Sequence, residues 1–323
     1  MNRPLDDLPN DYPIELTPPD ISPYAEGTHG VPYVHTLEAT APGPHVAISA
    51  VVHGNEPAGA IALDRFLRDG IRPVRGRLSF AFVNVAAYEA FDATNPNASR
   101  WVDEDFNRLW SPSILDGERT SVELRRAREI RPWLDGVDLL LDIHTMQHRT
   151  APLMMAGPTD KGLALARAVG VPEIVVSDTG HAAGPRMRDY TDFVDPASSR
   201  NALLVECGQH WEADAETRAL DTSVRFLRAT GAIGEDVGGD RPSAGVGRQR
   251  LLEITHRVTI ETDRFAFADD YVGLDVLPEA DTVFARDGDQ TLRTPYDDCV
   301  LVMPSKRLWQ GQTAVRLGRF VDG

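Results

Sequence analysis

The chain has 323 residues, of which 42% are hydrophobic and 25% charged, the ordinary balance of a globular protein with a buried core. This length suits one large domain with a smaller one. The formal net charge of -16, from 49 acidic and 33 basic residues, argues against a nucleic-acid-binding or membrane-surface protein. No stretch approaches the roughly 18–20 apolar residues of a membrane span. Residues 1–20 contain Pro and Asp without the apolar core of a secretory signal, so we expect a cytoplasmic protein.

Apolar runs alternate with helical stretches from about residue 45 to residue 230. The pattern predicts strands at residues 45–52, 78–85, 137–143 and 202–207, and helices at residues 58–67, 120–134 and 213–227. Such alternation favours an α/β fold in which helices cover a largely parallel sheet.

The remaining segments divide the chain further. The proline-rich residues 1–40 predict an extended arm before the α/β domain of residues 41–232. Residues 233–249 are rich in Gly and read as a linker. Residues 250–323 have short apolar runs broken by Asp, Gly and Pro, which predicts a small all-β domain. With only Cys207 and Cys299 present, we expect neither a disulfide framework nor a thiolate metal site.

The sequence HGNE follows the first predicted strand and contains His53 and Glu56. An imidazole and a carboxylate three residues apart can converge on one cation, and a catalytic zinc site takes three protein ligands. His144 supplies a third candidate, because it ends another predicted strand and ligands gather at the carboxyl ends of strands in α/β sheets. The alternative for HGNE is a simple turn into a helix, with Asn55 as its cap and Pro57 in its first turn.

Asp142 precedes His144 by two residues and therefore faces the same side of the strand. A carboxylate there could orient His53 or His144 by accepting a ring N–H, or it could simply bond to nearby backbone.

A polar cluster occupies residues 100–108, where Arg100, Asn107 and Arg108 stand in an otherwise acidic chain. Arg and Asn recognise carboxylates through directional, charge-assisted hydrogen bonds. The acidic residues 103–105 leave open an ordinary ion-paired surface loop.

Glu206 ends the apolar run of residues 202–205. A buried carboxylate is costly unless it is paired or functional, so Glu206 is either a salt-bridged strand-end residue or a general base with a raised pKa.

These motifs, in this order, resemble the succinylglutamate desuccinylase and aspartoacylase family, which is related to the zinc carboxypeptidases. The resemblance rests on four blocks: HGNE at 53–56, RWVDEDFNRLW at 100–110, LLLDIHT at 139–145 and LLVECG at 203–208. It implies a mixed sheet covered by helices, with a smaller C-terminal all-β domain that partly covers the cleft and excludes long peptides.

The resemblance also implies roles for individual residues. His53, Glu56 and His144 would hold one zinc ion, and Glu206 would carry the proton. Arg100 would polarise the scissile carbonyl, while Asn107 and Arg108 would grip the substrate's carboxylate. The implied activity is zinc-dependent hydrolysis of the amide bond of a small N-acyl amino acid.

The chain departs from aspartoacylases near this site, because Pro196 stands where they have a further arginine and Cys-Gly-Gln follows Glu206. The acyl group, the amino acid and any homo-oligomeric state are therefore left open. Candidates for the acyl pocket are the loop residues His148, His181, Arg186, Arg188 and Arg200. Two other functions stay as alternatives: a carboxypeptidase-like peptidase, and a zinc-binding protein without catalytic activity.

Overall fold

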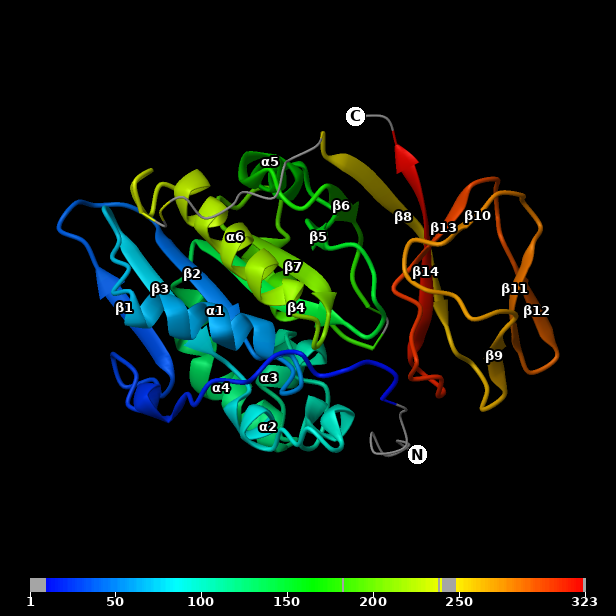
Figure 1. The fold of residues 1–323 in the computed structure, drawn as a ribbon, viewed down its shortest axis with the longest axis horizontal. Coiled ribbons are helices and arrows are strands. Elements are labelled where there is room, and N and C mark those ends of the chain that lie inside the picture. Colours follow the sequence, from blue (N-terminus) through cyan, green and yellow to red (C-terminus); the bar gives the residue numbers. More distant parts are fainter. Residues whose placement is uncertain (1–9, 182, 238, 240–247, 322–323) are drawn as a thin grey trace.

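A computed structural model describes residues 10–181, 183–237, 239 and 248–321 (Figure 1). The strands are β1 Val34–Glu38, β2 His45–Ala50, β3 Arg77–Phe82, β4 Leu139–Met146, β5 Leu153–Met155, β6 Ile174–Ser177, β7 Asn201–Gln209, β8 Arg250–Thr259, β9 Phe265–Phe267, β10 Val276–Leu277, β11 Val283–Asp287, β12 Gln290–Arg293, β13 Cys299–Val302 and β14 Thr313–Val321. The α-helices are α1 Pro57–Arg68, α2 Val85–Glu89, α3 Pro112–Leu115, α4 Val122–Asp135, α5 Asp160–Val169 and α6 Asp214–Ala229.

The strands form an 11-stranded mixed sheet, in the order β1-β3-β2-β4-β7-β5-β6-β8-β14-β13-β10, and a 3-stranded sheet of β12, β11 and β9. The neighbours β3, β2, β4 and β7 are parallel. Strand β5 runs antiparallel to β7, and β1 antiparallel to β3. The α/β class and the mixed sheet covered by helices are thus confirmed.

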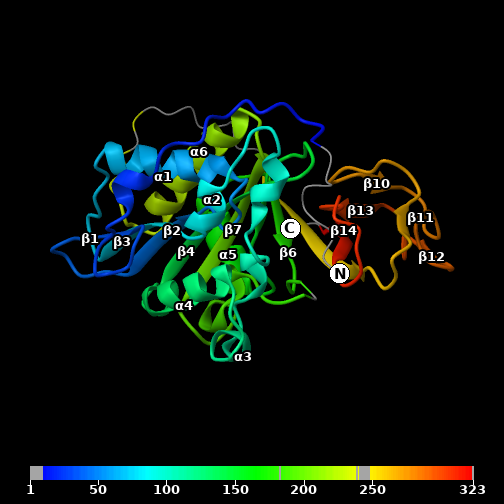
Figure 2. The same cartoon turned by 90° about the horizontal axis from the view of Figure 1, so that it is seen from below.

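Helices cover both faces of the large sheet around β3, β2, β4 and β7, as the two views in Figures 1 and 2 show. Along β2, Val46 and Ile48 pack in the cluster that contains residues of α1, α5 and α6. Ala47, which points to the opposite face, packs in the cluster that contains residues of α4. Both faces of β2 are therefore buried, which explains why this strand reads as a continuous apolar run.

The four strands and three helices predicted from the sequence between residues 45 and 230 correspond to β2, β3, β4, β7, α1, α4 and α6. The sequence pattern did not predict α2, α3, α5 or the short strands β1, β5 and β6. From residue 248 to residue 321 the structure has strands but no helix.

The domain boundaries remain predictions. Most of the predicted linker, residues 238 and 240–247, lies outside the described residues, as do residues 1–9 of the predicted arm. The C-terminal strands continue the large sheet, because β8 pairs with β6 in parallel and β14 pairs with β8.

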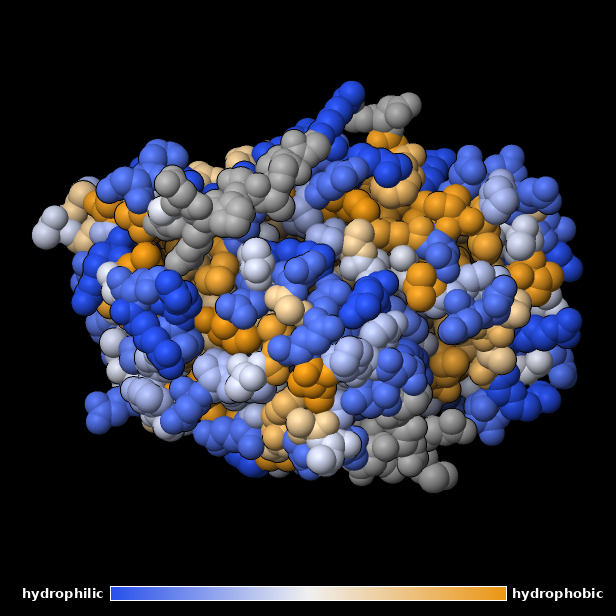
Figure 3. Space-filling model, viewed as in Figure 1, coloured by the Kyte–Doolittle hydropathy of each residue, from blue (hydrophilic) through white to orange (hydrophobic). Residues whose placement is uncertain are grey.

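The surface in Figure 3 is mostly hydrophilic, with hydrophobic residues in several small groups, one of them over β10 and β13. Val276 of β10 is one of the exposed large hydrophobic residues. Among the described residues, no helix has both the length and the apolar character that crossing a bilayer would require.

Helix α1 lies unusually close to the sheet at Gly59. A Cβ atom added there would lie 2.7 Å from Cβ of Ala50 and 3.1 Å from Cγ2 of Ile143. Any side chain at this position would push the first turn of α1, which follows Glu56 directly, away from β2 and β4.

We expect Gly59→Ala to destabilise the protein, because an overpacked contact costs about 1–3 kcal/mol and exceeds the gain in helix propensity of at most about 1 kcal/mol. Urea unfolding would measure the change, with Arg65→Ala on the exposed side of α1 as the control. A Gly59→Ala protein as stable as the wild type would show that α1 can move away from the sheet without cost.

Candidate active site

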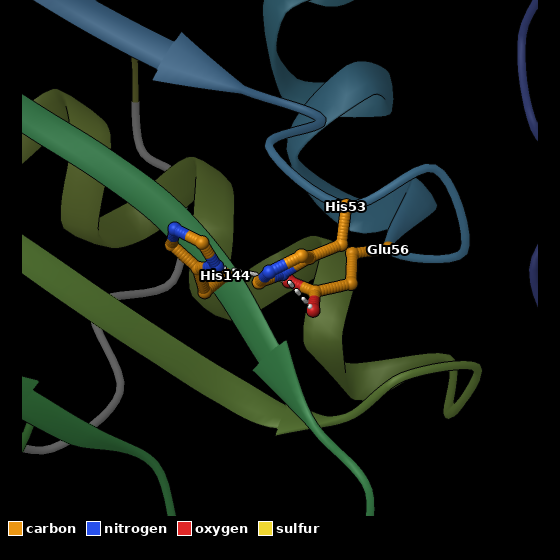
Figure 4. A group of neighbouring side chains, drawn as sticks. All are labelled: His53, Glu56 and His144. Carbon is orange, nitrogen blue, oxygen red and sulfur yellow. Dashed lines mark hydrogen bonds and ion pairs between the residues drawn. The ribbon is translucent and has the colours of Figure 1, made fainter. Parts of the chain in front are cut away.

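Two parallel strands bring the predicted ligands together. Strands β2 and β4 are neighbours with Ser49 opposite Asp142, so the residues after β2 lie beside the carboxyl end of β4. His53 and Glu56 occupy the loop from β2 into α1, and His144 lies on β4 (Figure 4). Glu56 itself is the N-cap residue of α1 and Pro57 follows in the first turn; no side chain caps the helix, so Asn55 does not have that role.

A glycine is required inside the HGNE loop. The Gly54 N–H donates to the carbonyl oxygen of Arg100 at 3.1 Å. A Cβ atom at Gly54 would lie 2.2 Å from the carbonyl carbon of Ala87 and 2.3 Å from the carbonyl oxygen of Ser99. These are backbone atoms that cannot rotate away, so only glycine lets the loop contact the segment that carries Arg100.

His53, Glu56 and His144 form a buried cluster whose possible ligand atoms all lie within 4.8 Å of one another. The Glu56 carboxylate lies between the two imidazoles, with Oε1 2.7 Å from Nδ1 of His53 and Oε2 3.2 Å from Nδ1 of His144. Burial would raise the pKa of Glu56, but the two histidines hold it well below its ordinary value. An ionised carboxylate and two imidazoles are a donor set that fits zinc and other transition metals.

Two further carboxylates contact the far sides of these imidazoles. Asp142 Oδ2 lies 2.8 Å from Nε2 of His144, and its other oxygen accepts a hydrogen bond from Ser49 at 2.7 Å. Asp105 Oδ1 lies 3.0 Å from Nε2 of His53. Of the two histidines considered for Asp142, the geometry therefore pairs it with His144. The sequence motif gave no indication of this Asp105 contact, because Asp105 stands among three consecutive acids that are typical of a surface loop.

Arg100 lies directly beside the cluster and is 6% exposed. Its Nη1 donates to Oε1 of Glu56 at 3.1 Å, and its Nη2 lies 2.8 Å from Nε2 of His53. A carbonyl group at this cluster would therefore meet a guanidinium as well as any metal ion.

Asn107 and Arg108 lie in a short 3-10 turn, Phe106–Arg108, and both line the same cavity as the cluster. The Asn107 side-chain oxygen accepts from the Met187 N–H at 2.8 Å, which leaves the amide N–H₂ group as the available donor. Arg108 Nη1 donates to the carbonyl oxygen of Asn107 at 2.6 Å, while its Nη2 lies 3.8 Å from Asp105. Asn107 and Arg108 therefore lie at the cavity wall. Within the same segment Asp103 is exposed and Glu104 pairs with Arg119, so the ion-paired surface loop describes this part of it.

Glu206 lies within β7, which extends past it to Gln209. It is opposite His144 in the parallel pairing of β7 with β4, so both side chains point to the same face of the sheet. Glu206 is 6% exposed, its Oε2 has no hydrogen-bond partner, and it forms no ion pair with a described residue. Burial raises the pKa of Glu206 to about 8, although His144 opposes the shift. The salt-bridge alternative for this residue is therefore wrong within the described part of the chain.

The acyl-pocket candidates divide into two groups. His148, His181 and Arg186 line the cavity. Arg188 instead donates to the carbonyl oxygens of Ala156 and Ala202, and Arg200 to that of Val137.

Three ionisable residues that line the cavity were not predicted from the sequence: His210, Arg307 and Arg316. His210 lies four residues after Glu206, with Nδ1 2.9 Å from Oγ1 of Thr145, and its spacing from Glu206 was an available signal. Arg316 lies on β14 and Arg307 in the loop between β13 and β14, and no motif marks either residue. Their place follows from the pairing of β8 with β6, which links residues 174–177 to residues 250–253.

The chain is similar in sequence and in fold to known proteins of one family. Residues 42–229, more than half of the chain, match the model of the succinylglutamate desuccinylase/aspartoacylase catalytic domain. The chain is 25% identical over 290 residues to a succinylglutamate desuccinylase of Paraburkholderia xenovorans, covering 83% of this chain and 79% of that protein.

Among solved structures, the succinylglutamate desuccinylase of Vibrio parahaemolyticus is similar with a TM-score of 0.68 at 19% identity, covering 90% of this chain and 87% of that one. A succinylglutamate desuccinylase/aspartoacylase of Rhodobacter sphaeroides has a TM-score of 0.64 at 15% identity and covers 98% of this chain and 99% of its own. With its catalytic domain matched over this range, the chain belongs to the succinylglutamate desuccinylase/aspartoacylase family.

Proposed function

We propose that this protein hydrolyses the amide bond of a small N-acyl amino acid in a zinc-dependent reaction, with Glu206 as general base and then general acid. The observation that carries the proposal is the buried, unpartnered carboxylate of Glu206 opposite His144. A protein that only binds a metal does not need such a group, and burying it is costly. A silent zinc-binding protein is therefore disfavoured.

The donor set of the buried cluster supports zinc as the metal. His53, Glu56 and His144 would hold the ion, which would polarise the scissile carbonyl and lower the pKa of a water molecule toward about 7. In the proposed reaction Glu206 accepts a proton as the water oxygen attacks the amide carbon. The C–N bond then breaks, and Glu206 gives the proton to the departing amine nitrogen. The products are a carboxylate and a free amino acid.

Arg100 would act on the scissile carbonyl in this hydrolysis, whereas Asn107 and Arg108 would act on the substrate's carboxylate. Arg100 is placed to donate to the carbonyl oxygen as negative charge develops, an effect worth about 3–4 kcal/mol for one well-placed donor. Asn107 and Arg108 would hold the substrate's carboxylate and so fix the amide carbon near Glu206.

The cavity wall favours small substrates over peptides. Residues from the C-terminal strands and their loops, among them Gly273, Met303 and Arg307, line the cavity together with the metal cluster. A carboxypeptidase-like peptidase would need room for a chain that continues past the scissile bond. Activity on acylated amino acids without activity on tetrapeptides would distinguish the two functions.

We expect Glu206→Gln to keep its metal and lose turnover by about 10²- to 10⁴-fold, the usual contribution of a general acid or base. Metal content by emission spectroscopy and amine release from N-acyl amino acids would measure the two effects. Glu118→Gln, at an exposed position, is the matched control, and chelator-treated wild type should be inactive. A Glu206→Gln protein with near wild-type turnover would remove Glu206 from its proposed role.

The same variant should reveal the raised pKa in the metal-free protein. With its pKa raised to about 8 from 4.5, folded Glu206 retains a proton that the unfolded chain releases. Its stabilising effect is thus complete below pH 4.5 and is lost as the pH rises toward 8. The melting temperature of Glu206→Gln should therefore rise relative to that of the wild type between pH 5 and pH 8. A pH-independent difference would contradict the raised pKa.

Arg108→Ala should mainly raise KM, by about 10- to 100-fold, for substrates with a free carboxylate, because one charge-assisted interaction is lost. Steady-state kinetics on an N-acyl amino acid and on its carboxamide would test this expectation. If Arg108→Ala raised KM for the carboxamide as much as for the acid, Arg108 would not be the carboxylate-binding residue.

A further inference from the structure

The N-terminal arm of the chain contacts two loops that line the active-site cavity. One loop, residues 147–152, joins β4 to β5, and the other, residues 303–312, joins β13 to β14. We call them the rim loops, because Gln147 of the first and Ser305 of the second are among the cavity-lining residues. In Figure 1 the arm, coloured dark blue, runs along the helices of the α/β part toward the C-terminal strands. None of its contacts takes part in the proposed reaction.

The arm is anchored to the α/β part of the molecule just after its contacts with the rim loops. Leu16 and Ile21 are buried and pack in the hydrophobic cluster that contains residues of α1 and α6. The Glu15 N–H donates to the carbonyl oxygen of Trp211 at 2.9 Å, and Oε2 of Glu15 accepts from the Ala213 N–H at 2.9 Å. This anchored segment holds the preceding residues, Asp11 and Tyr12, against the rim loops.

Tyr12 contacts both rim loops at once. Its hydroxyl oxygen accepts a hydrogen bond from the Arg149 N–H at 3.2 Å. The Lys306 ammonium nitrogen lies 5.0 Å from the centre of the Tyr12 ring, and the guanidinium carbon of Arg149 lies 6.0 Å from it. Both cations are close enough for attraction to the face of the ring. Asp11 adds an ion pair with Lys306, with Oδ2 2.5 Å from Nζ. One tyrosine therefore joins a loop of the α/β part to a loop of the C-terminal strands.

The residues that the arm contacts are direct neighbours of residues in the cavity wall. Arg149 follows His148, and Lys306 follows Ser305, and both of these neighbours line the cavity. The rim loops also contact each other, because the Lys306 N–H donates to the side-chain oxygen of Gln147 at 2.9 Å. A shift of Arg149 or Lys306 would therefore move the wall of the cavity.

We propose that Tyr12 is a positioning residue of this enzyme, which joins the two rim loops so that the cavity wall is ordered before the substrate binds. The proposal rests on the proposed function, because it concerns substrate binding in the same cavity. A substrate that meets ordered walls loses less binding free energy to the ordering of loops. Because Tyr12 acts through the rim loops rather than on the reacting atoms, it affects substrate binding and leaves the chemical step unchanged.

Three variants test the proposal. Tyr12→Ala removes the ring and the hydroxyl, whereas Tyr12→Phe keeps the ring and removes only the hydroxyl. Thr17→Ala, at an exposed position of the same arm, is the matched control. Steady-state kinetics would be measured on N-succinylglutamate or N-acetylaspartate, whichever the wild type hydrolyses faster.

We expect Tyr12→Ala to raise KM about 3- to 10-fold and to leave kcat within about twofold of the wild-type value, because only the ordering of the rim loops is lost. Tyr12→Phe should recover part of the loss, and Thr17→Ala should match the wild type. A lower kcat at unchanged KM would overturn the proposal, and so would wild-type kinetics in Tyr12→Ala. An equal rise of KM in Thr17→Ala would also overturn it, because the effect would then not belong to Tyr12.

Amide hydrogen exchange tests the same contacts without any turnover, so it decides on the role of Tyr12 even if the wild type hydrolyses neither compound and the proposed function fails. We expect exchange in residues 303–312 to be at least about threefold faster in Tyr12→Ala than in the wild type, with unchanged exchange in β7. The Lys306 N–H is bonded to Gln147 rather than to Tyr12, so faster exchange there would report movement of the loop.

Two results of the exchange measurement would overturn the proposal. Equal exchange of residues 303–312 in both proteins would show that Tyr12 does not hold this rim loop. Exchange that becomes faster in β7 as well would show that Tyr12 contributes only to the stability of the whole fold.

Discussion

The parallel register of β4 with β7 is the constraint on which the rest of the site depends. It sets His144 opposite Glu206, and the neighbouring register of β2 with β4 sets Ser49 opposite Asp142. Backbone hydrogen bonds of three buried strands therefore fix one metal-ligand candidate, its orienting carboxylate and the proposed proton carrier. A slip of one residue in either pairing would turn these side chains to opposite faces of the sheet and separate them.

The cavity is rich in positively charged side chains, although the whole chain has a negative net charge. The chain has a formal net charge of -16, yet five arginines line this one cavity. Most of them are balanced locally by nearby acids such as Glu56, Asp105 and Asp178. Among the residues that the structure describes, Arg307 forms no ion pair, and burial raises the pKa of Glu206 to about 8.

Strands and candidate site residues could be predicted from the sequence where they form a continuous apolar run or a short motif. Strands β2, β3, β4 and β7 are buried on both faces and read as apolar runs, and the histidines and acids of the cluster stand in short motifs. The three-residue strand β5 is too short to show a pattern. The contact of Asp105 with His53 depends on the path of an irregular loop. The position of Arg307 at the cavity depends on the pairing of strands that are distant in the sequence. Such long-range geometry has no local signature.

The pairing of β6 with β8 makes the C-terminal strands part of the same sheet as the metal cluster. Arg316, on β14, is thus linked to the cluster by strand pairing through β8, β6, β5 and β7. A site assembled in this way is preorganised: little conformational entropy is lost when a ligand enters, because the walls need not close around it. Selectivity in this molecule should then arise from the fit of charges in a fixed enclosure, and changing the substrate should require new side chains rather than a new motion.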